Sequence, residues 1–280
     1  MKLVQYIKLA RLDKPIGIYL LLWPSLMGLL IGGINANLTF KSFLIVLCGA
    51  IIVRSCGCVI NDISDHNIDK SVKRTQTRPL AAGKLTIFEA WTFFAILALF
   101  SLAILLITPK LTQMISLIFA VCIVIYPLTK RFLNAPQVFL GITFGSGAII
   151  SYSLVNSDFS ISILLLYIAV ICWTISFDTF YAMEDLKDDL KIGINSTAIL
   201  WKDNAIKVAL FFHYVFLGIF TIIGLLNEFS IAFYFFVLLL VIFVFIQIGY
   251  IKKKKYLEAF KFNNWVGMIC VLALSSEIIW

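Results

Sequence analysis

The sequence has few charged residues and no long polar segment. Only 14% of its 280 residues are Asp, Glu, Lys or Arg, whereas 61% are hydrophobic. Soluble globular domains contain about a quarter charged residues, so this composition excludes the ordinary soluble classes. The longest polar stretch, 61–86, is too short to form a soluble domain. We therefore expect a single integral membrane domain over residues 1–280.

Cysteine and histidine are also scarce. All six cysteines lie inside apolar runs, where a small packing side chain is the expected role. The sequence therefore predicts neither a disulfide framework nor a zinc site. His66 and His213 lack the spacing of metal ligands, although His66 lies beside an acidic cluster and would line a site there.

Nine apolar runs approach the roughly twenty residues that a helix needs to cross a hydrocarbon core of about 30 Å. The expected spans are 16–34, 42–60, 87–107, 111–128, 138–155, 161–183, 205–226, 230–251 and 264–280. The predicted fold class is therefore all-α integral membrane, with nine transmembrane helices.

The net charge of +8 follows membrane topology and does not form a nucleic-acid-binding patch. If the N-terminus is inside, the only basic residues in the outer segments are Lys41 and Lys110. Arg54 lies within a span, and the other Lys and Arg residues fall in inner segments. Because inner loops are enriched in Lys and Arg, we expect a cytoplasmic N-terminus. The lack of an Arg- and Ser-rich presequence favours a bacterial cytoplasmic (inner) membrane. The bilayer is then the expected partner, with no nucleic acid and no obligate protein partner inferred.

Two acidic clusters end apolar runs on the same predicted side. Asp62, Asp65 and Asp69 are spaced by three and then four residues, so a helix would place these carboxylates on one face. A second cluster, at residues 185–189, repeats the arrangement four spans later. This recurrence predicts two parallel four-helix repeats plus a ninth helix, with both clusters at the cytoplasmic rim.

Converging carboxylates need cations between them. Two carboxylates about 4 Å apart repel by roughly 4 kcal/mol at an effective dielectric near 20. Magnesium is the expected cation because it prefers oxygen ligands and is usually held by one or two carboxylates together with substrate phosphates. The alternative for such acids is a solvated helix face. The predicted metal ligands are Asn61, Asp62, Asp65, Asp69, Asp185, Asp188 and Asp189.

Basic residues follow the first cluster and the fourth span, which predicts a diphosphate site. Arginine offers a two-pronged fork to phosphate oxygens and lysine a point charge. The alternative is topology alone, since any inner loop attracts these residues. The candidates are Lys73, Arg74, Arg78, Tyr126, Lys130 and Arg131.

Arg54 lies well inside the second span. An arginine there costs roughly 2.5–3.5 kcal/mol on insertion scales and usually faces the bundle interior with a partner. That partner is either an anionic substrate group or Asp178, in a structural ion pair. Asp178 itself has either a chemical role or a helix-to-helix hydrogen bond.

Several motifs resemble the UbiA superfamily of intramembrane prenyltransferases, and the resemblance extends over essentially the whole chain. They are Asp-Lys-Pro-Ile-Gly at 13–17 followed by Leu-Leu-Trp-Pro at 21–24, Asn-Asp-x-x-Asp-x-x-x-Asp at 61–69, and Tyr-Ala-Met-x-Asp at 181–185. The first and last of these resemble the hydroxybenzoate branch. The resemblance implies a helical bundle with a lateral opening to lipid, magnesium at the acidic motifs and a cytoplasmic cap.

The activity that the resemblance implies is magnesium-dependent transfer of a polyprenyl group from polyprenyl diphosphate to the 3-position of 4-hydroxybenzoate, in ubiquinone biosynthesis. Arg54 matches the anchor of the aromatic carboxylate. The diphosphate contacts of the family are matched by Lys73, Arg74, Arg78, Tyr126 and Lys130. The expected catalytic residues are Asp65, Asp69, Asp185 and Asp189, with Asp185 the first choice for removing a proton.

Two other functions remain open at the level of sequence. A prenyltransferase for another aromatic acceptor, such as a dihydroxynaphthoate or homogentisate, would share the acids but would not need Arg54 against a benzoate carboxylate. A secondary transporter could use Arg54 and Asp178 as its substrate and proton sites. The acidic residues of such a transporter would lie near the membrane midplane, whereas the two acidic clusters of this sequence lie at the predicted cytoplasmic rim.

Overall fold

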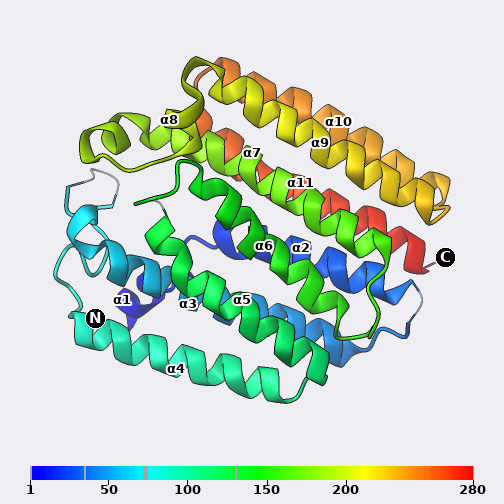
Figure 1. Cartoon of the computed structure of the whole chain (residues 1–280), viewed down its shortest axis with the longest axis horizontal. Coiled ribbons are helices and arrows are strands. Elements are labelled where there is room, and N and C mark those ends of the chain that lie inside the picture. Colours follow the sequence, from blue (N-terminus) through cyan, green and yellow to red (C-terminus); the bar gives the residue numbers. More distant parts are fainter. Residues whose placement is uncertain (1, 35, 72–74, 130, 280) are drawn as a thin grey trace.

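The chain forms a bundle of long helices (Figure 1), and its computed structural model describes residues 2–34, 36–71, 75–129 and 131–279. Within these ranges the regular structure is helical. The α-helices are α1 (Lys2–Leu9), α2 (Ile16–Gly33), α3 (Phe40–Asp69), α4 (Ile87–Leu106), α5 (Lys110–Thr129), α6 (Pro136–Tyr152), α7 (Ile161–Ile192), α8 (Thr197–Trp201), α9 (Ala205–Leu226), α10 (Ile231–Lys252) and α11 (Tyr256–Ile279), with a 3₁₀ turn η1 (Lys202–Asn204) between α8 and α9.

Eight helical segments among the described residues are long and apolar enough to cross a membrane, so the chain is a multi-pass membrane protein. The ninth run predicted to span, 138–155, corresponds to α6, which has only 17 residues. At 1.5 Å per residue α6 is roughly 25 Å long, shorter than a typical hydrocarbon core. Most of its side chains are buried, and it packs between α2, α5 and α7.

Polar side chains fix several helix starts. Thr39 and Thr86 each accept a hydrogen bond from the backbone of the residue three positions on, and Ser42 and Glu89 return the bond, which makes capping boxes at α3 and α4. Ser160 caps α7 by accepting from the Ile163 amide. These caps follow local sequence, which is why the predicted starts of the corresponding spans lie close to the observed ones.

The core lies where α2, α6, α7, α9 and α11 meet. Trp173, Phe177 and Phe216 are buried there; Trp173 stacks on Phe216 at a ring-centroid distance of 5.3 Å and meets Phe177 edge-to-face at 5.5 Å. Helices α2 and α6 approach closely at Gly28, where a Cβ atom would lie 2.1 Å from the carbonyl oxygen of Ala148. Such small-residue contacts let membrane helices pack backbone to backbone.

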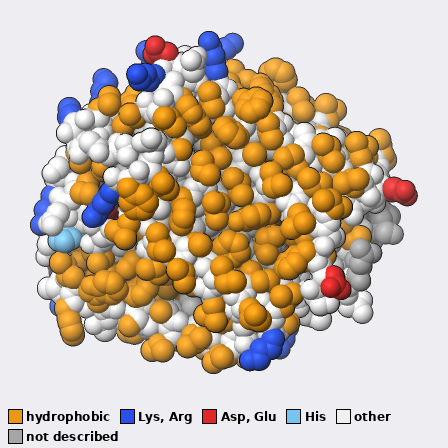
Figure 2. Space-filling view, viewed as in Figure 1, with side chains coloured by type: hydrophobic (Ala, Val, Ile, Leu, Met, Phe, Trp, Pro, Cys, Tyr) orange, Lys and Arg blue, Asp and Glu red, His pale blue; other side chains and the backbone are white. Residues whose placement is uncertain are grey.

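The outer helices expose apolar side chains instead. Only 6% of the spanning window of α4, 11% of that of α5 and 22% of that of α10 is buried. Figure 2, drawn from the same direction as Figure 1, shows hydrophobic side chains over the middle of the visible surface and Lys and Arg side chains at its margins. This is the surface expected of helices that contact lipid.

Both acidic clusters lie at one end of the bundle, on the left in Figure 1, together with α1 and α8. Helix α3 continues through its cluster to Asp69 and α7 through its own to Ile192, well past the predicted ends of these spans. The connection after α3 packs against the bundle through Leu80 and Leu85, which are buried with Leu9 of α1. This end of the molecule is therefore built from helix ends and from the described part of that connection, which packs against α1.

Candidate active site

The acidic face of α3 points into the protein. The residues Asp62, Asp65 and Asp69 are only 1%, 2% and 5% exposed. Their spacing places the carboxylates on one helix face, as predicted, and burial makes charge partners necessary. Asn61 precedes them and is half-buried, and the His66 ring hydrogen-bonds the carbonyl of Ile63.

Two arginines supply part of that compensation. Arg11, in the turn between α1 and α2, donates from Nη2 to both oxygens of Asp62, at 2.7 and 3.0 Å. Arg78 donates from Nη1 to Asp62 at 3.1 Å and to Asp69 at 2.8 Å. Four alternating charges thus join three segments of the chain. The connection is fixed further because the Thr75 hydroxyl donates to the Asp69 carbonyl at 3.0 Å.

The second acidic cluster occupies the last turns of α7. Asp185, Asp188 and Asp189 are half-buried, and Asp188 lies 3.8 Å from the exposed Lys191. Gly193 ends the helix with a φ of 74°, and its amide donates to the Asp189 carbonyl at 2.9 Å. This left-handed cap sets where α7 stops and so where its terminal carboxylates lie.

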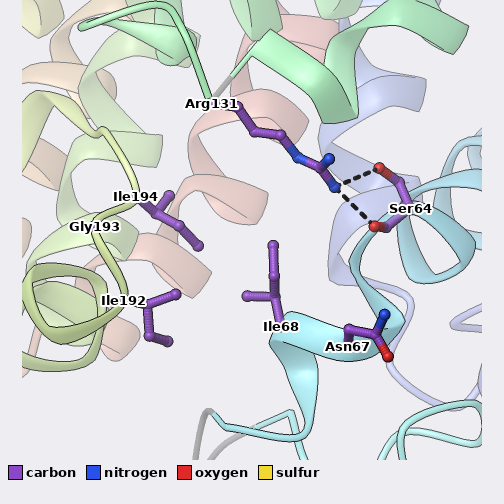
Figure 3. Close-up of a pocket in the computed structure, with 7 residues that line it drawn as sticks. All are labelled: Ser64, Asn67, Ile68, Arg131, Ile192, Gly193 and Ile194. Atoms are coloured by element: carbon purple, nitrogen blue, oxygen red, sulfur yellow. Dashed lines mark hydrogen bonds between the residues drawn. The ribbon is translucent and has the colours of Figure 1, made fainter.

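A cavity of about 510 Å³ lies between the ends of α3 and α7 (Figure 3). Its walls are formed by Ser64, Asn67 and Ile68 from α3, by 192–194 at the end of α7, and by Arg131 from the connection after α5. Arg131 Nη2 donates to the carbonyl and the hydroxyl of Ser64 at 2.9 and 3.4 Å. The ends of α3 and α7, each of which carries an acidic cluster, therefore border a single space.

The donor set fits a magnesium ion that also takes ligands from a substrate. Both helix ends offer carboxylate oxygens, the ligand type that magnesium prefers. Among the described residues, no three His, Cys, Asp or Glu side chains converge closely enough to hold an ion by themselves. Asp62 fits this role poorly because both of its oxygens accept hydrogen bonds from arginine.

Arg54 lies deeper in the bundle, beside a small cavity of about 40 Å³ that Tyr126, Thr143 and Phe144 also line. Its guanidinium carbon is 5.4 Å from the centre of the Phe144 ring, a cation–π contact. Its buried Nε atom has no hydrogen-bond partner among the described residues. The sequence left open a structural ion pair between Arg54 and Asp178. Among the described residues, these two side chains do not form a direct ion pair with each other.

Tyr126 connects the two regions. Its hydroxyl lies within electrostatic range of Asp178, Arg54 and Asp65, which come from α7 and α3. The deep cavity and the acidic face of α3 are therefore parts of one polar interior.

Three predicted diphosphate residues, Lys73, Arg74 and Lys130, lie outside the described residues. Arg78 and Arg131 are described: Arg78 pairs with Asp62 and Asp69, and Arg131 lines the large cavity. Sequence reasoning missed Arg11 as a site residue. The available signal was its place beside the Asp-Lys-Pro-Ile-Gly motif, immediately before the first span.

The UbiA prenyltransferase family matches residues 21–269 of this sequence. The chain belongs to the UbiA prenyltransferase family. This membership confirms the predicted resemblance. A family member named 4-hydroxybenzoate octaprenyltransferase from Shewanella loihica is 37% identical over 286 residues, covering 99% of this chain and 97% of the relative. Another of the same name from Shewanella amazonensis is 38% identical and covers 97% and 94% of the two chains.

Solved structures of UbiA homologues share the fold. The apo structure of a homologue from Aeropyrum pernix K1 has a TM-score of 0.81 at 22% identity, covering 94% of this chain and 96% of the other. A homologue from Archaeoglobus fulgidus bound to GPP and Mg²⁺ has a TM-score of 0.73 at 18% identity, covering 99% and 100%. At these identities the likeness shows that the overall arrangement of helices is shared.

Proposed function

We propose that this UbiA-family protein transfers a polyprenyl group from polyprenyl diphosphate to the 3-position of 4-hydroxybenzoate, in a magnesium-dependent step of ubiquinone biosynthesis. The observation that carries the proposal is that the ends of α3 and α7, which carry the two acidic clusters, border one cavity, with Arg131 in its wall and Arg78 paired with acids of α3. The near-full-length relatives named 4-hydroxybenzoate octaprenyltransferase support the choice of acceptor.

The same proposal places the protein in a bacterial cytoplasmic membrane with its N-terminus and acidic end facing the cytoplasm. We count α6 as a ninth span within one domain over residues 1–280, arranged as two parallel four-helix repeats plus α11. The lysine-rich connection at 252–255 supports this orientation, because inner loops are enriched in basic residues.

At the ends of α3 and α7 that border the large cavity, the proposed metal ligands are Asn61, Asp65, Asp69, Asp185, Asp188 and Asp189. Bound magnesium would stabilise the negative charge of the departing diphosphate. Arg78 and Arg131 would contact the diphosphate through their planar N–H donors. Tyr126, Lys73, Arg74 and Lys130 complete the proposed set of contacts.

In the deeper cavity, Arg54 would bind the benzoate carboxylate. The ring carbon ortho to the hydroxyl attacks the first prenyl carbon, whose bond to the diphosphate oxygen breaks as the new carbon–carbon bond forms. The proton then leaves that ring carbon for a nearby carboxylate, and Asp185 remains the first candidate. The cavity of about 40 Å³ must enlarge to admit an aromatic ring, since ligand pockets are typically about 300–1,000 Å³.

The test is an assay of membranes with labelled 4-hydroxybenzoate and polyprenyl diphosphates of several lengths, with and without a magnesium chelator. We expect prenylation that the chelator abolishes. Asp65→Asn and Asp185→Asn should each reduce turnover at least about a hundredfold, since removing one stabilising contact to developing charge typically costs this much. Asp203→Asn, which alters an exposed acid at the same end, is the matched control.

Normal turnover by either site variant would contradict the proposed site. Equal or better turnover with a dihydroxynaphthoate or homogentisate would instead assign another acceptor. Solute uptake into liposomes without any prenylation would point to a transporter.

A further inference from the structure

Arg11 occupies an unusual backbone position at the edge of the site. It lies in the turn between α1 and α2 with a φ of 59°, a left-handed conformation that non-glycine residues rarely adopt. Its Nη1 atom donates to the Lys8 carbonyl at 3.0 Å, while Nη2 donates to both oxygens of Asp62. Backbone outliers of this kind persist where the surroundings hold them, and they cluster at functional sites.

Asp62 differs from its neighbours on α3 in its partners. Its side chain is 1% exposed, and its Oδ1 atom accepts from Arg11 and from Arg78, while Oδ2 accepts from Arg11. Asp69, in contrast, accepts from Arg78 through Oδ2. A metal bound to Asp62 would have to compete with two guanidinium groups for the same oxygens.

We propose that Asp62 is a positioning residue and not a metal ligand, and that with Arg11 it holds Arg78 in place for the substrate diphosphate. The inference rests on the proposed function, since it assigns the diphosphate as the ligand of Arg78. A guanidinium has five N–H donors, so Arg78 can bind carboxylates and a phosphate group together. Arg11 thereby acts on the substrate through Asp62.

The pairing also explains why the α1–α2 turn belongs to the site. Arg78 comes from the connection after α3, whereas Arg11 comes from the start of the chain, and Asp62 is the only described acid that both contact. Removing Arg11 leaves Arg78 as the remaining arginine on Asp62, so Arg78 would shift toward Asp62 and out of its position for the diphosphate. The cost falls on diphosphate binding and not on the metal.

The experiment compares Arg11→Gln, Asp62→Asn and the double variant with the wild-type protein in detergent. The first readout is the KM for polyprenyl diphosphate. The second needs no turnover: the shift in Tm with Mg²⁺ alone and with Mg²⁺ plus inorganic pyrophosphate. Asp65→Asn serves as the metal-ligand reference, and Lys8→Gln removes an exposed charge from α1 as the matched control.

We expect each single variant to raise the diphosphate KM roughly tenfold, because one charge-assisted contact is misplaced. The double variant should show no larger effect, since both changes break one link. The Mg²⁺ concentration for a half-maximal Tm shift should stay unchanged in Asp62→Asn and rise in Asp65→Asn. Arg11→Lys, which keeps the charge without the fork, should have an intermediate KM and replaces Arg11→Gln if that variant does not fold.

An Asp62→Asn variant that needs as much extra Mg²⁺ as Asp65→Asn would overturn the inference, as would multiplying effects in the double variant. An unchanged KM in Arg11→Gln would do so too. The proposed function fails separately, through a wild-type protein that does not prenylate 4-hydroxybenzoate. In that case the pyrophosphate-dependent Tm shifts still decide the roles of Arg11 and Asp62.

Discussion

At the scale of single residues, partners distinguish aspartates that spacing makes equivalent. Asp62, Asp65 and Asp69 share one face of α3, and sequence periodicity correctly places all three there. Periodicity contains no information on Arg11, which lies 51 positions before Asp62. Residue types therefore predicted the acidic face and its basic neighbours, whereas the pairing within them depends on tertiary contacts that no local pattern encodes.

Arg54 provides the residue-scale prediction. Arg54→Leu should raise the KM for 4-hydroxybenzoate roughly tenfold to a hundredfold, because a hydrogen-bonded charge pair contributes about 1.5–3 kcal/mol. The KM for polyprenyl diphosphate should stay unchanged, since Arg54 is not among the proposed diphosphate contacts. Steady-state kinetics with each substrate varied in turn provide the measurement.

Arg54→Lys is the matched variant for this prediction. It keeps the positive charge but not the planar fork, so its KM for 4-hydroxybenzoate should fall between those of the wild type and Arg54→Leu. Equal losses for both substrates would show that Arg54 supports the fold of the site and does not bind the aromatic acid.

At the scale of elements, apolar runs predicted most helices closely. The observed bounds of α2, α4, α5, α9 and α10 lie within about two residues of the predicted spans, because a membrane helix is as long as its apolar run. Differences arise where helices leave the bilayer. Helices α3, α7 and α11 extend into polar sequence at the acidic end. The short helices α1 and α8 were not predicted, because neither contains an apolar run long enough to span a membrane.

Gly193 provides the element-scale prediction. A Cβ atom there would meet no neighbour within 4 Å, so Gly193→Ala tests backbone conformation alone. Alanine is disfavoured at a φ of 74° by about 1 kcal/mol, which should lower the Tm by roughly 2–4 °C. Magnesium-dependent turnover should fall as well, since the last turn of α7 carries Asp189.

Gly193→Asn is the control, because asparagine tolerates the left-handed conformation better than alanine does. Its Tm and turnover should lie closer to the wild-type values. Identical behaviour of the two variants would mean that the cap does not determine the position of the α7 carboxylates.

At the scale of the whole molecule, the distribution of charge predicts how the bundle sits in the membrane. A cysteine replacing Ser157 should react with a membrane-impermeant maleimide in intact cells, because that connection is expected outside. A cysteine replacing Lys253 should react only after the cells are permeabilised. Both positions are exposed, and the wild-type chain corrects for labelling of its own cysteines. The reverse pattern would invert the proposed topology.

The contact between the first helix and later ones bears on how the protein is made. Lys2 lies 2.6 Å from Glu89 of α4, and Arg11 pairs with Asp62. A nascent chain meets these partners only after α3 and α4 have emerged from the ribosome. The earliest residues to be synthesised therefore dock late, so the proposed site gains its Arg11–Asp62 pair only after the membrane helices have been inserted.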